Sequence, residues 1–120
     1  MALVQIQNEF AGHAALLIQE VQKRGFYCTF GDAYRAPQFQ QWYLDHGYSN
    51  AEHSQHSKRL AIDLNLFTES GEWITTVLMG TDLWVRLQLL GAWWKHLHPA
   101  NRWGGDWLEL QDYGHFERRE

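Results

Sequence analysis

The sequence predicts an α+β domain in which helices pack against a small, mainly antiparallel sheet. Three segments space their apolar residues three and four positions apart, as amphipathic helices do, and a central segment alternates apolar and polar residues, as a half-buried strand does. Turn residues separate several short apolar runs. Because 120 residues leave no room for a second core of ordinary size, we expect residues 1–120 to form a single domain.

The first half of the chain predicts helix, strand and helix in that order. Residues 10–23 have helical spacing and are followed by Gly25, a common helix stop. Residues 26–30 are aromatic and β-favouring, so they predict a short strand that leads into a loop carrying Arg35. A proline opens residues 37–46, which predict a second helix.

The second half predicts a strand, a hairpin and a third helix. Residues 48–59 are polar and aperiodic, which indicates a loop. Residues 60–67 alternate, which places Asp63 on the face opposite the leucines. Turn residues then lead into a second hairpin strand over 73–76, and residues 81–97 have helical spacing after a capping threonine or aspartate.

Composition and charge exclude several kinds of partner. The net charge of −4 offers no broad positive field for nucleic acid or for an anionic membrane surface. The apolar runs are far shorter than the roughly 18 residues that span a bilayer, and no secretory signal is visible, so we expect a cytoplasmic location. Cys28 is the single cysteine, and we interpret it as a buried, inert thiol.

Two histidines and an aspartate form a candidate metal site. Asp63 follows His56 by seven positions, and His115 lies in a second chemically rich segment over residues 112–117. Two imidazoles and one carboxylate are a common ligand set of catalytic zinc, which leaves a fourth position for water. Spacing alone does not separate this set from a chance grouping, and His53 competes with His56 as a ligand.

Charged residues near these positions fit supporting roles. Asp112 closely precedes a proposed ligand and is the candidate general base, with Glu109 and Glu117 as competitors. By strand alternation Glu117 shares a face with the histidine of its segment, so it is also a candidate for orienting that ring. Arg35 would face the oxyanion of a tetrahedral intermediate, or it would simply pair with Asp32 at the surface.

Four motifs occur together in the chain. They are Gly31-Asp32-Ala33-Tyr34-Arg35 with Gln38, Ser54-x-His56-x(4)-Ala61-x-Asp63, Trp103-Gly104-Gly105-Asp106-Trp107, and Asp112-x-x-His115-Phe116-Glu117. In type and order these motifs resemble the LAS-type zinc peptidases of the M15 family. That family includes D-alanyl-D-alanine dipeptidases and carboxypeptidases and phage L-alanyl-D-glutamate endolysins.

The resemblance implies a zinc ion (Zn²⁺) held by His56, Asp63 and His115, with Asp112 as general base and Arg35 assisting the transition state. It also implies that the sheet carries the zinc site, as in hedgehog-like and DD-peptidase-like folds. The implied substrate is the stem peptide of bacterial peptidoglycan. Candidate substrate contacts are Ser54, Gln38, Arg59, Trp103 and Trp107.

Two positions refine the comparison. The dipeptidases usually carry glutamate where this chain has Asp112, which favours the phage endolysin branch and cleavage between L-alanine and D-glutamate. The family commonly has glycine where this chain has Arg59, so a positive φ at that position would strain the arginine. We interpret Arg59 as a contact for an acidic wall peptide.

Two alternative functions stay open. A D-alanyl-D-alanine carboxypeptidase or dipeptidase would keep the metal and change the bond, whereas a non-catalytic module would only bind zinc. Retention of Asp112 and Arg35 disfavours the module, because a structural zinc site needs neither. We expect a monomer, and a lytic enzyme without a visible signal fits release from the host cytoplasm through holin-made holes.

Overall fold

The computed structural model describes residues 1–47 and 54–120 and confirms the α+β architecture. Four antiparallel strands form one sheet in the order β1-β2-β4-β3. The helices are α1 (Leu3–Lys23), α2 (Pro37–Asp45) and α3 (Asp82–Leu97), with the short 3-10 helices η1 (Gln55–Lys58) and η2 (Gly104–Asp106). The strands are β1 (Tyr27–Phe30), β2 (Ala61–Phe67), β3 (Asn101–Trp103) and β4 (His115–Arg118).

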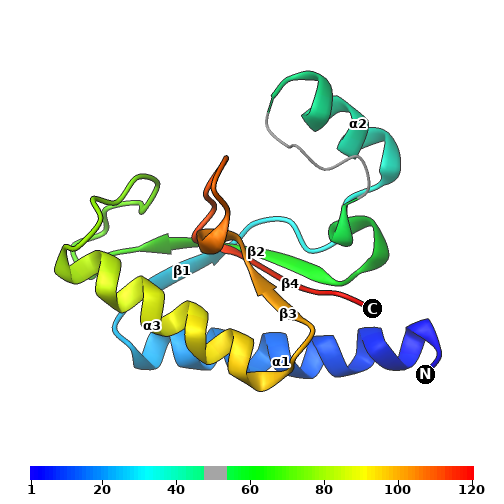
Figure 1. The fold of residues 1–120 in the computed structure, drawn as a ribbon, viewed down its shortest axis with the longest axis horizontal. Coiled ribbons are helices and arrows are strands. Elements are labelled where there is room, and N and C mark those ends of the chain that lie inside the picture. The colour runs from blue at the N-terminus through cyan, green and yellow to red at the C-terminus, as the bar shows by residue number, and fades with distance from the viewer. Residues whose placement is uncertain (48–53) are drawn as a thin grey trace.

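Helices α1 and α3 contact each other and lie against one face of the sheet (Figure 1). Their buried residues recur at helical spacing, with Leu17 and Val21 from α1 and Leu87 and Trp94 from α3. Phe116 of β4 meets them from the sheet, and its ring packs nearly perpendicular to Trp94 with 5.7 Å between ring centroids. The core therefore occupies one face of the sheet and leaves the other for polar side chains.

Strand β2 presents two different faces, as its alternation predicts. Leu64 and Leu66 are buried in the core, whereas Asp63 belongs to the opposite face. The turn predicted after β2 also forms, since Thr68 N–H donates to Glu72 O at 2.9 Å. The face of β2 that carries Asp63 is thus fixed by burial of its leucines, because a slip of one residue would expose them.

Two predicted boundaries differ from the structure. Residues 73–76 form a single bridge to β2 rather than a strand, because only Ile74 among them is buried and the segment has no apolar face to pack. Helix α1 begins at Leu3 rather than at residue 10. Its first turns are mostly exposed, with Val4 68% accessible and Ile6 only partly buried against the core, so fully buried apolar residues recur only from Phe10 onward.

The face of the sheet opposite α1 and α3 is framed by irregular segments. Figure 1 shows α2 and the loops between β2 and α3 and between β3 and β4 on that side. The loop predicted over residues 48–59 is in part the 3-10 helix η1, and residues 48–53, with His53, lie outside the described residues. The histidine and aspartate motifs converge on this framed face.

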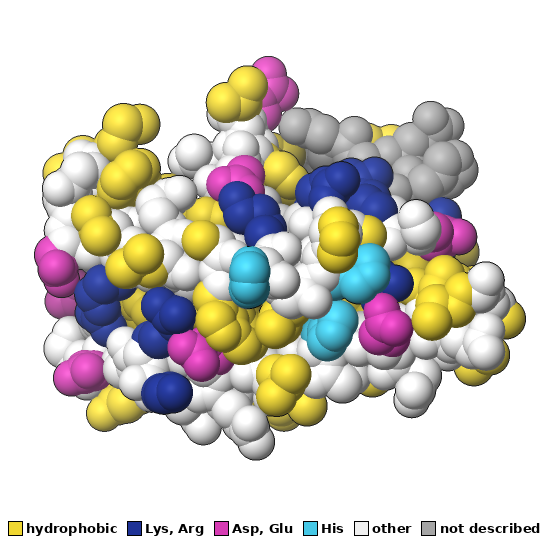
Figure 2. Space-filling view, turned by 60° about the horizontal axis from the view of Figure 1, so that its bottom comes forward, with side chains coloured by type: hydrophobic (Ala, Val, Ile, Leu, Met, Phe, Trp, Pro, Cys, Tyr) yellow, Lys and Arg dark blue, Asp and Glu magenta, His cyan; other side chains and the backbone are white. Residues whose placement is uncertain are grey.

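The surface is mixed in charge over the face shown in Figure 2. Basic and acidic side chains alternate there with hydrophobic ones among the described residues. No helix in residues 1–47 or 54–120 is long and apolar enough to cross a membrane. The mixture of charges in Figure 2 indicates no broad electrostatic interface on this face.

Candidate metal centre

Asp63 and His115 are partners across β2 and β4. The backbone N–H and C=O of Asp63 bond instead to Asp32 O and Gly31 N on the β1 side, both at 2.8 Å. The pair with His115 is therefore a non-hydrogen-bonded pair, a type that brings side chains closer together. Asp63 Oδ1 accordingly lies 2.9 Å from His115 Nδ1.

Two glycines allow the segment before β4 to lie flat against its neighbours. A Cβ at Gly114 would overlap the carbonyl oxygen of Leu64, and a Cβ at Gly104 would overlap that of Asp112. Backbone bonds confirm the close approach, since Leu64 N–H donates to Gly114 O at 2.8 Å and Asp112 N–H donates to Gly104 O at 3.0 Å. These glycines therefore set the position from which Asp112 and His115 reach the site.

The 3-10 helix η1 positions His56, which is only 1% exposed. Ser54 Oγ caps η1 by accepting a hydrogen bond from His56 N–H at 3.1 Å. The ring Nδ1 lies 3.3 Å from Ala33 O, and Nε2 lies 3.1 Å from Asp63 Oδ2. Ser54 is buried and its hydroxyl serves the backbone of a proposed ligand, and its contact with substrate stays a prediction.

The three residues fit a zinc ion. One ligand atom from each of His56, Asp63 and His115 can be chosen so that all three lie within 4.8 Å of one another. His56 Nε2 is buried and faces Asp63 without hydrogen-bond geometry, and such an orphaned atom is costly unless it binds something. Imidazole and carboxylate donors are those of catalytic zinc sites. Within the described part of the chain, this is the one group of its kind.

Glu117 holds the far side of the His115 ring, as strand alternation predicts. Its Oε1 lies 2.8 Å from His115 Nε2, and its Oε2 pairs with Arg119 Nε at 2.8 Å. The second nitrogen of a ligating histidine usually donates to such a carboxylate, which fixes the tautomer and the ring orientation. His115 Nδ1 is therefore the nitrogen available to a metal.

The groups of the cluster shift one another's pKa. Burial would raise the pKa of Asp63, but the hydrogen bond from His115 and the close approach of the His56 ring outweigh it and hold that pKa well below its usual range. Burial would lower the pKa of His115, but hydrogen bonds to Asp63 and Glu117 raise it to about 9. Without a metal, the cluster thus favours an imidazolium at His115 between two carboxylates.

Asp112 borders the cluster from the turn before β4. Its Oδ1 accepts from Gly114 N–H at 3.2 Å, and its backbone oxygen accepts from His115 N–H at 3.2 Å. The side chain keeps access to solvent, yet partial burial and the charge of Asp63 raise its pKa. A carboxylate with a raised pKa is suited to accept and return a proton. Its competitor Glu117 is already engaged with His115.

Arg35 is held beside the cluster with 12% of its side chain exposed. Its guanidinium donates to Asp32 Oδ2 at 3.0 Å and to Gln40 Oε1 at 2.8 Å, and it lies 3.5 Å from Asp63 Oδ2. Arg35 therefore both pairs with Asp32 and reaches the site. The sequence motif points to Gln38, which is exposed, rather than to buried Gln40. The large apolar residues of α2, Phe39 and Trp42, are exposed, so they do not reveal its inward face.

The two tryptophans predicted to line a substrate groove have different surroundings. Trp103 is 1% exposed, and its Nε1 donates to Tyr113 O at 2.9 Å. β3 therefore turns this ring into the core, and the contact of Trp103 with substrate stays a prediction. Trp107 is half-buried, and its ring centroid lies 4.7 Å from that of His115, which places it at the site.

Arg59 has a left-handed backbone conformation with φ +59° at the end of η1. The structure thus has the positive φ that the family's usual glycine indicates, and an arginine there carries strain. Its guanidinium lies 4.1 Å from the centre of the exposed Tyr34 ring, a cation-π contact. Arg59 therefore presents a cation at the surface beside the loop that carries Arg35.

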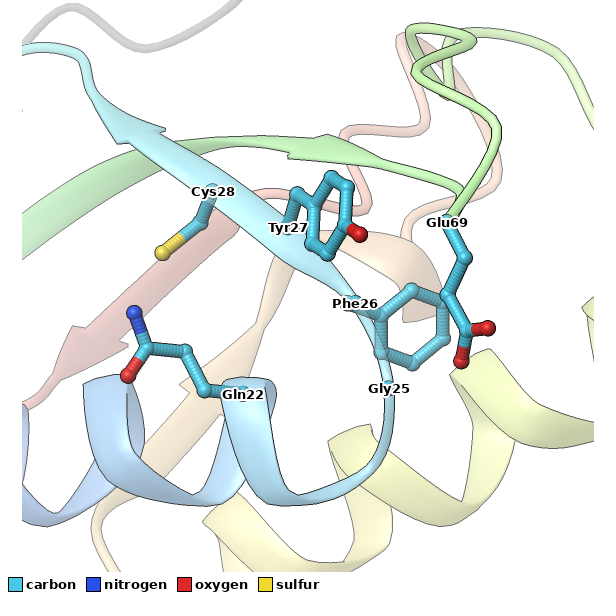
Figure 3. Close-up of a pocket in the computed structure, with 6 residues that line it drawn as sticks. All are labelled: Gln22, Gly25, Phe26, Tyr27, Cys28 and Glu69. Atoms are coloured by element: carbon cyan, nitrogen blue, oxygen red, sulfur yellow. The ribbon is translucent and has the colours of Figure 1, made fainter.

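Of two hollows on the described surface, one adjoins the cluster and the other does not. The hollow of about 270 Å³ has Asp63 and Asp112 in its wall. The other, of about 440 Å³, lies between the end of α1 and β1 and includes no metal-site residue (Figure 3). In it Cys28 points toward Gln22 (Figure 3), and burial raises the pKa of the half-buried thiol, which agrees with an inert cysteine.

Comparison with known proteins identifies relatives of this chain. A model of the M15 peptidases described as D-alanyl-D-alanine carboxypeptidase matches residues 47–118, more than half of the chain. Among solved structures, the chain is similar to the crystal structure of Serratia marcescens L-Ala D-Glu endopeptidase ChiX. The TM-score is 0.60 and the identity 18%, over 86% of this chain and 75% of that chain. At this identity the likeness shows a shared fold.

Proposed function

This chain belongs to the M15 peptidase family, and we propose that it is a zinc-dependent hydrolase of peptidoglycan stem peptides, cleaving between L-alanine and D-glutamate. The observation that carries the proposal is the convergence of His56, Asp63 and His115 within 4.8 Å, with a buried, unpartnered ring nitrogen among them. This donor set fits zinc with a position left for water.

The proposed ligand atoms follow from the contacts of each ring. His56 Nδ1 is directed at Ala33 O and His115 Nε2 at Glu117, so His56 Nε2 and His115 Nδ1 are the nitrogens directed at Asp63. Zinc bound there would supply Lewis acidity and would lower the pKa of the attacking water toward about 7. The chain itself supplies the remaining acid, base and cation.

Asp112 and Arg35 are assigned the proton transfer and the charge stabilisation. Asp112 takes a proton from the water that attacks the scissile carbonyl and returns it to the nitrogen of the leaving amine, so that the amide bond yields a carboxylate and an amine. The raised pKa of Asp112 supports this exchange. Arg35, fixed by Asp32 and Gln40, faces the oxyanion.

Arg59 and Trp107 are proposed as substrate contacts. Arg59 is exposed, held over Tyr34, and would pair with a carboxylate of the wall peptide. Trp107 packs beside His115 and would cover the substrate where the ligands meet it. Gln38 keeps the same proposed role from its exposed position at the start of α2.

The choice of bond rests on likeness and is open to direct test. The structural neighbour is named as an L-Ala D-Glu endopeptidase, whereas the family model is described as a D-alanyl-D-alanine carboxypeptidase. A muramyl pentapeptide carries both bonds. Zinc-loaded protein should release the tetrapeptide that begins with D-glutamate, as read by mass spectrometry. Release of D-alanine alone would instead assign the carboxypeptidase activity to this chain.

A non-catalytic zinc module is the less well supported alternative. A structural site usually fills its fourth position with protein, whereas this cluster supplies three ligands and has a hollow beside it. A structural zinc requires neither Asp112 with its raised pKa nor Arg35, which lies 3.5 Å from Asp63. An intact pentapeptide after incubation with zinc-loaded protein would favour the module.

A further inference from the structure

The hollow beside the cluster runs along β2 away from the arginines. Its floor extends from Asp63 to Leu66, and its walls are residues 73–75 on one side and 111–114 on the other. Its volume is about 270 Å³, slightly below the roughly 300–1,000 Å³ of sites for drug-sized ligands, so it suits a fragment of one or two residues. We call this hollow the β2 groove.

The two ends of the site differ in charge. None of the described residues that line the β2 groove is Lys or Arg, and its carboxylates are Asp63 and Asp112. Beyond the start of β2, on the η1 side, stand Arg59, whose guanidinium lies over the Tyr34 ring, and Arg35, which pairs with Asp32 at 3.0 Å and lies 3.5 Å from Asp63. Along the direction of β2, the site therefore begins at a positively charged end and continues through the cluster. It ends in the β2 groove, which is lined by neutral side chains and by the carboxylates of Asp63 and Asp112.

We infer, resting on the function proposed above, that the substrate lies along β2 in one direction. Its uncharged acyl side, the alanine joined to the lactyl group of the sugar, occupies the β2 groove. Its leaving side, which bears the free carboxylate of D-glutamate, lies toward Arg59 and Arg35. The reverse direction would place that carboxylate against Asp112 with no cation in the groove wall, and like charges in contact disfavour binding.

Neutral polar side chains give the β2 groove its specificity. Gln111 is exposed at one wall, and its Oε1 accepts from the Tyr113 hydroxyl at 3.3 Å, which directs its NH₂ group elsewhere as a donor. Asn65 stands on the floor and is fixed by a bond from its Nδ2 to Thr29 Oγ1 at 3.2 Å. Such amides bind peptide groups without requiring a charge. Gln111, exposed and central to one wall, is the residue to test.

The test uses two peptides of the same shape. Both carry L-alanyl-γ-D-glutamyl-L-lysine, one with an N-succinyl group and the other with an N-succinamoyl group, so a carboxylate on the acyl side replaces a neutral amide. Zinc-loaded wild-type protein should cleave the succinamoyl peptide with a kcat/KM about tenfold higher, because like charges are disfavoured in the groove. Equal kcat/KM for the two peptides would overturn the assignment.

A charge placed in the groove should change this preference. Gln111→Lys should reduce the ratio of kcat/KM between the two peptides to about threefold or less, since the new cation attracts the succinyl carboxylate. Gln19→Lys, which adds the same charge on the exposed surface of α1, is the matched control and should keep the wild-type ratio. A ratio unmoved by Gln111→Lys would contradict the placement of the acyl side in the groove.

The leaving side is tested in the same assay. Amidating the α-carboxylate of D-glutamate should lower kcat/KM of the wild-type protein about tenfold, and Arg59→Gln should remove most of that difference. Equal cleavage of the amidated peptide would overturn the proposed direction while leaving the hydrolase function intact. Failure of zinc-loaded protein to cleave any of these peptides would instead overturn the proposed function, and this inference with it.

Discussion

Asp63 Oδ1 lies 2.9 Å from His115 Nδ1, although 52 positions separate the two residues in the chain. The register of β2 against β4 brings them together, and the other oxygen of the same carboxylate, Asp63 Oδ2, lies 3.1 Å from His56 Nε2. A slip of one residue would turn Asp63 to the other face of the sheet. Burial of the β2 leucines therefore fixes the face on which Asp63 lies as well as the packing of the strand.

Removing the proposed base should separate turnover from metal binding. Asp112→Ala should lower kcat by about 10²–10⁴-fold, the usual contribution of a general acid or base, while zinc stays bound at one ion per chain. Metal analysis and stem-peptide hydrolysis on the same sample measure both effects. Glu109→Ala is the control from the same loop and should keep its activity. Near-full activity of Asp112→Ala would transfer the role of base to another carboxylate.

Glu117 should act on zinc affinity through His115. Glu117→Ala removes the partner of His115 Nε2, and losses of this kind usually weaken metal binding by about 10–100-fold. Competition with a chromogenic chelator gives the Kd, and Glu72→Ala in the exposed turn after β2 is the control. An unchanged Kd for Glu117→Ala would mean that the ring of His115 is held without this carboxylate.

The left-handed backbone at Arg59 predicts an unusual stabilisation by glycine. Arg59→Gly and Arg59→Ala both lose the contact with Tyr34, but only glycine relieves the positive φ. Arg59→Gly should therefore be more stable than Arg59→Ala by about 1 kcal/mol, the usual cost of a left-handed non-glycine residue. Urea unfolding of the two variants measures the difference, and equal midpoints would show that the position carries no strain.

The pKa of His115 predicts how pH affects the zinc-free protein. Because the folded pKa of about 9 lies above the ordinary 6.5, its stabilisation is complete below about pH 6.5 and is lost as pH rises through about 9. The shift corresponds to roughly 3 kcal/mol. Urea unfolding with a chelator present tests this over that range, and a flat profile would contradict the ion pair. Zinc affinity should rise over the same range, since a ligating histidine must lose its proton.

Much of the fold was predictable because burial leaves periodic patterns. The alternation of β2 predicts the face of Asp63, and helical spacing predicts α3, since apolar residues in both pack on one core. The strand β3 was not predicted, because three residues are too few to show alternation. The first turns of α1 were not predicted, because its buried apolar residues begin only at Phe10.

The residue types of the candidate site could be predicted from the sequence, but the burial and the contacts of the residues around it could not. Resemblance to a family points to the motif residues, but it does not distinguish Trp103, which fills the core, from Trp107, which packs beside His115. Nor does it reveal Gln40, a buried amide that fixes Arg35. Such roles depend on which way a short segment turns, and three-residue strands and loops carry no periodic signal for that.

Zinc-dependent hydrolysis at His56, Asp63 and His115 is the central claim, and a zinc titration of chelator-stripped protein on purified peptidoglycan tests it most directly. Fragments read by mass spectrometry should be absent from the stripped protein, should appear in proportion to added zinc, and should reach a plateau at about one ion per chain. Full release of fragments by the stripped protein, or zinc binding at this stoichiometry with no fragments, would contradict it.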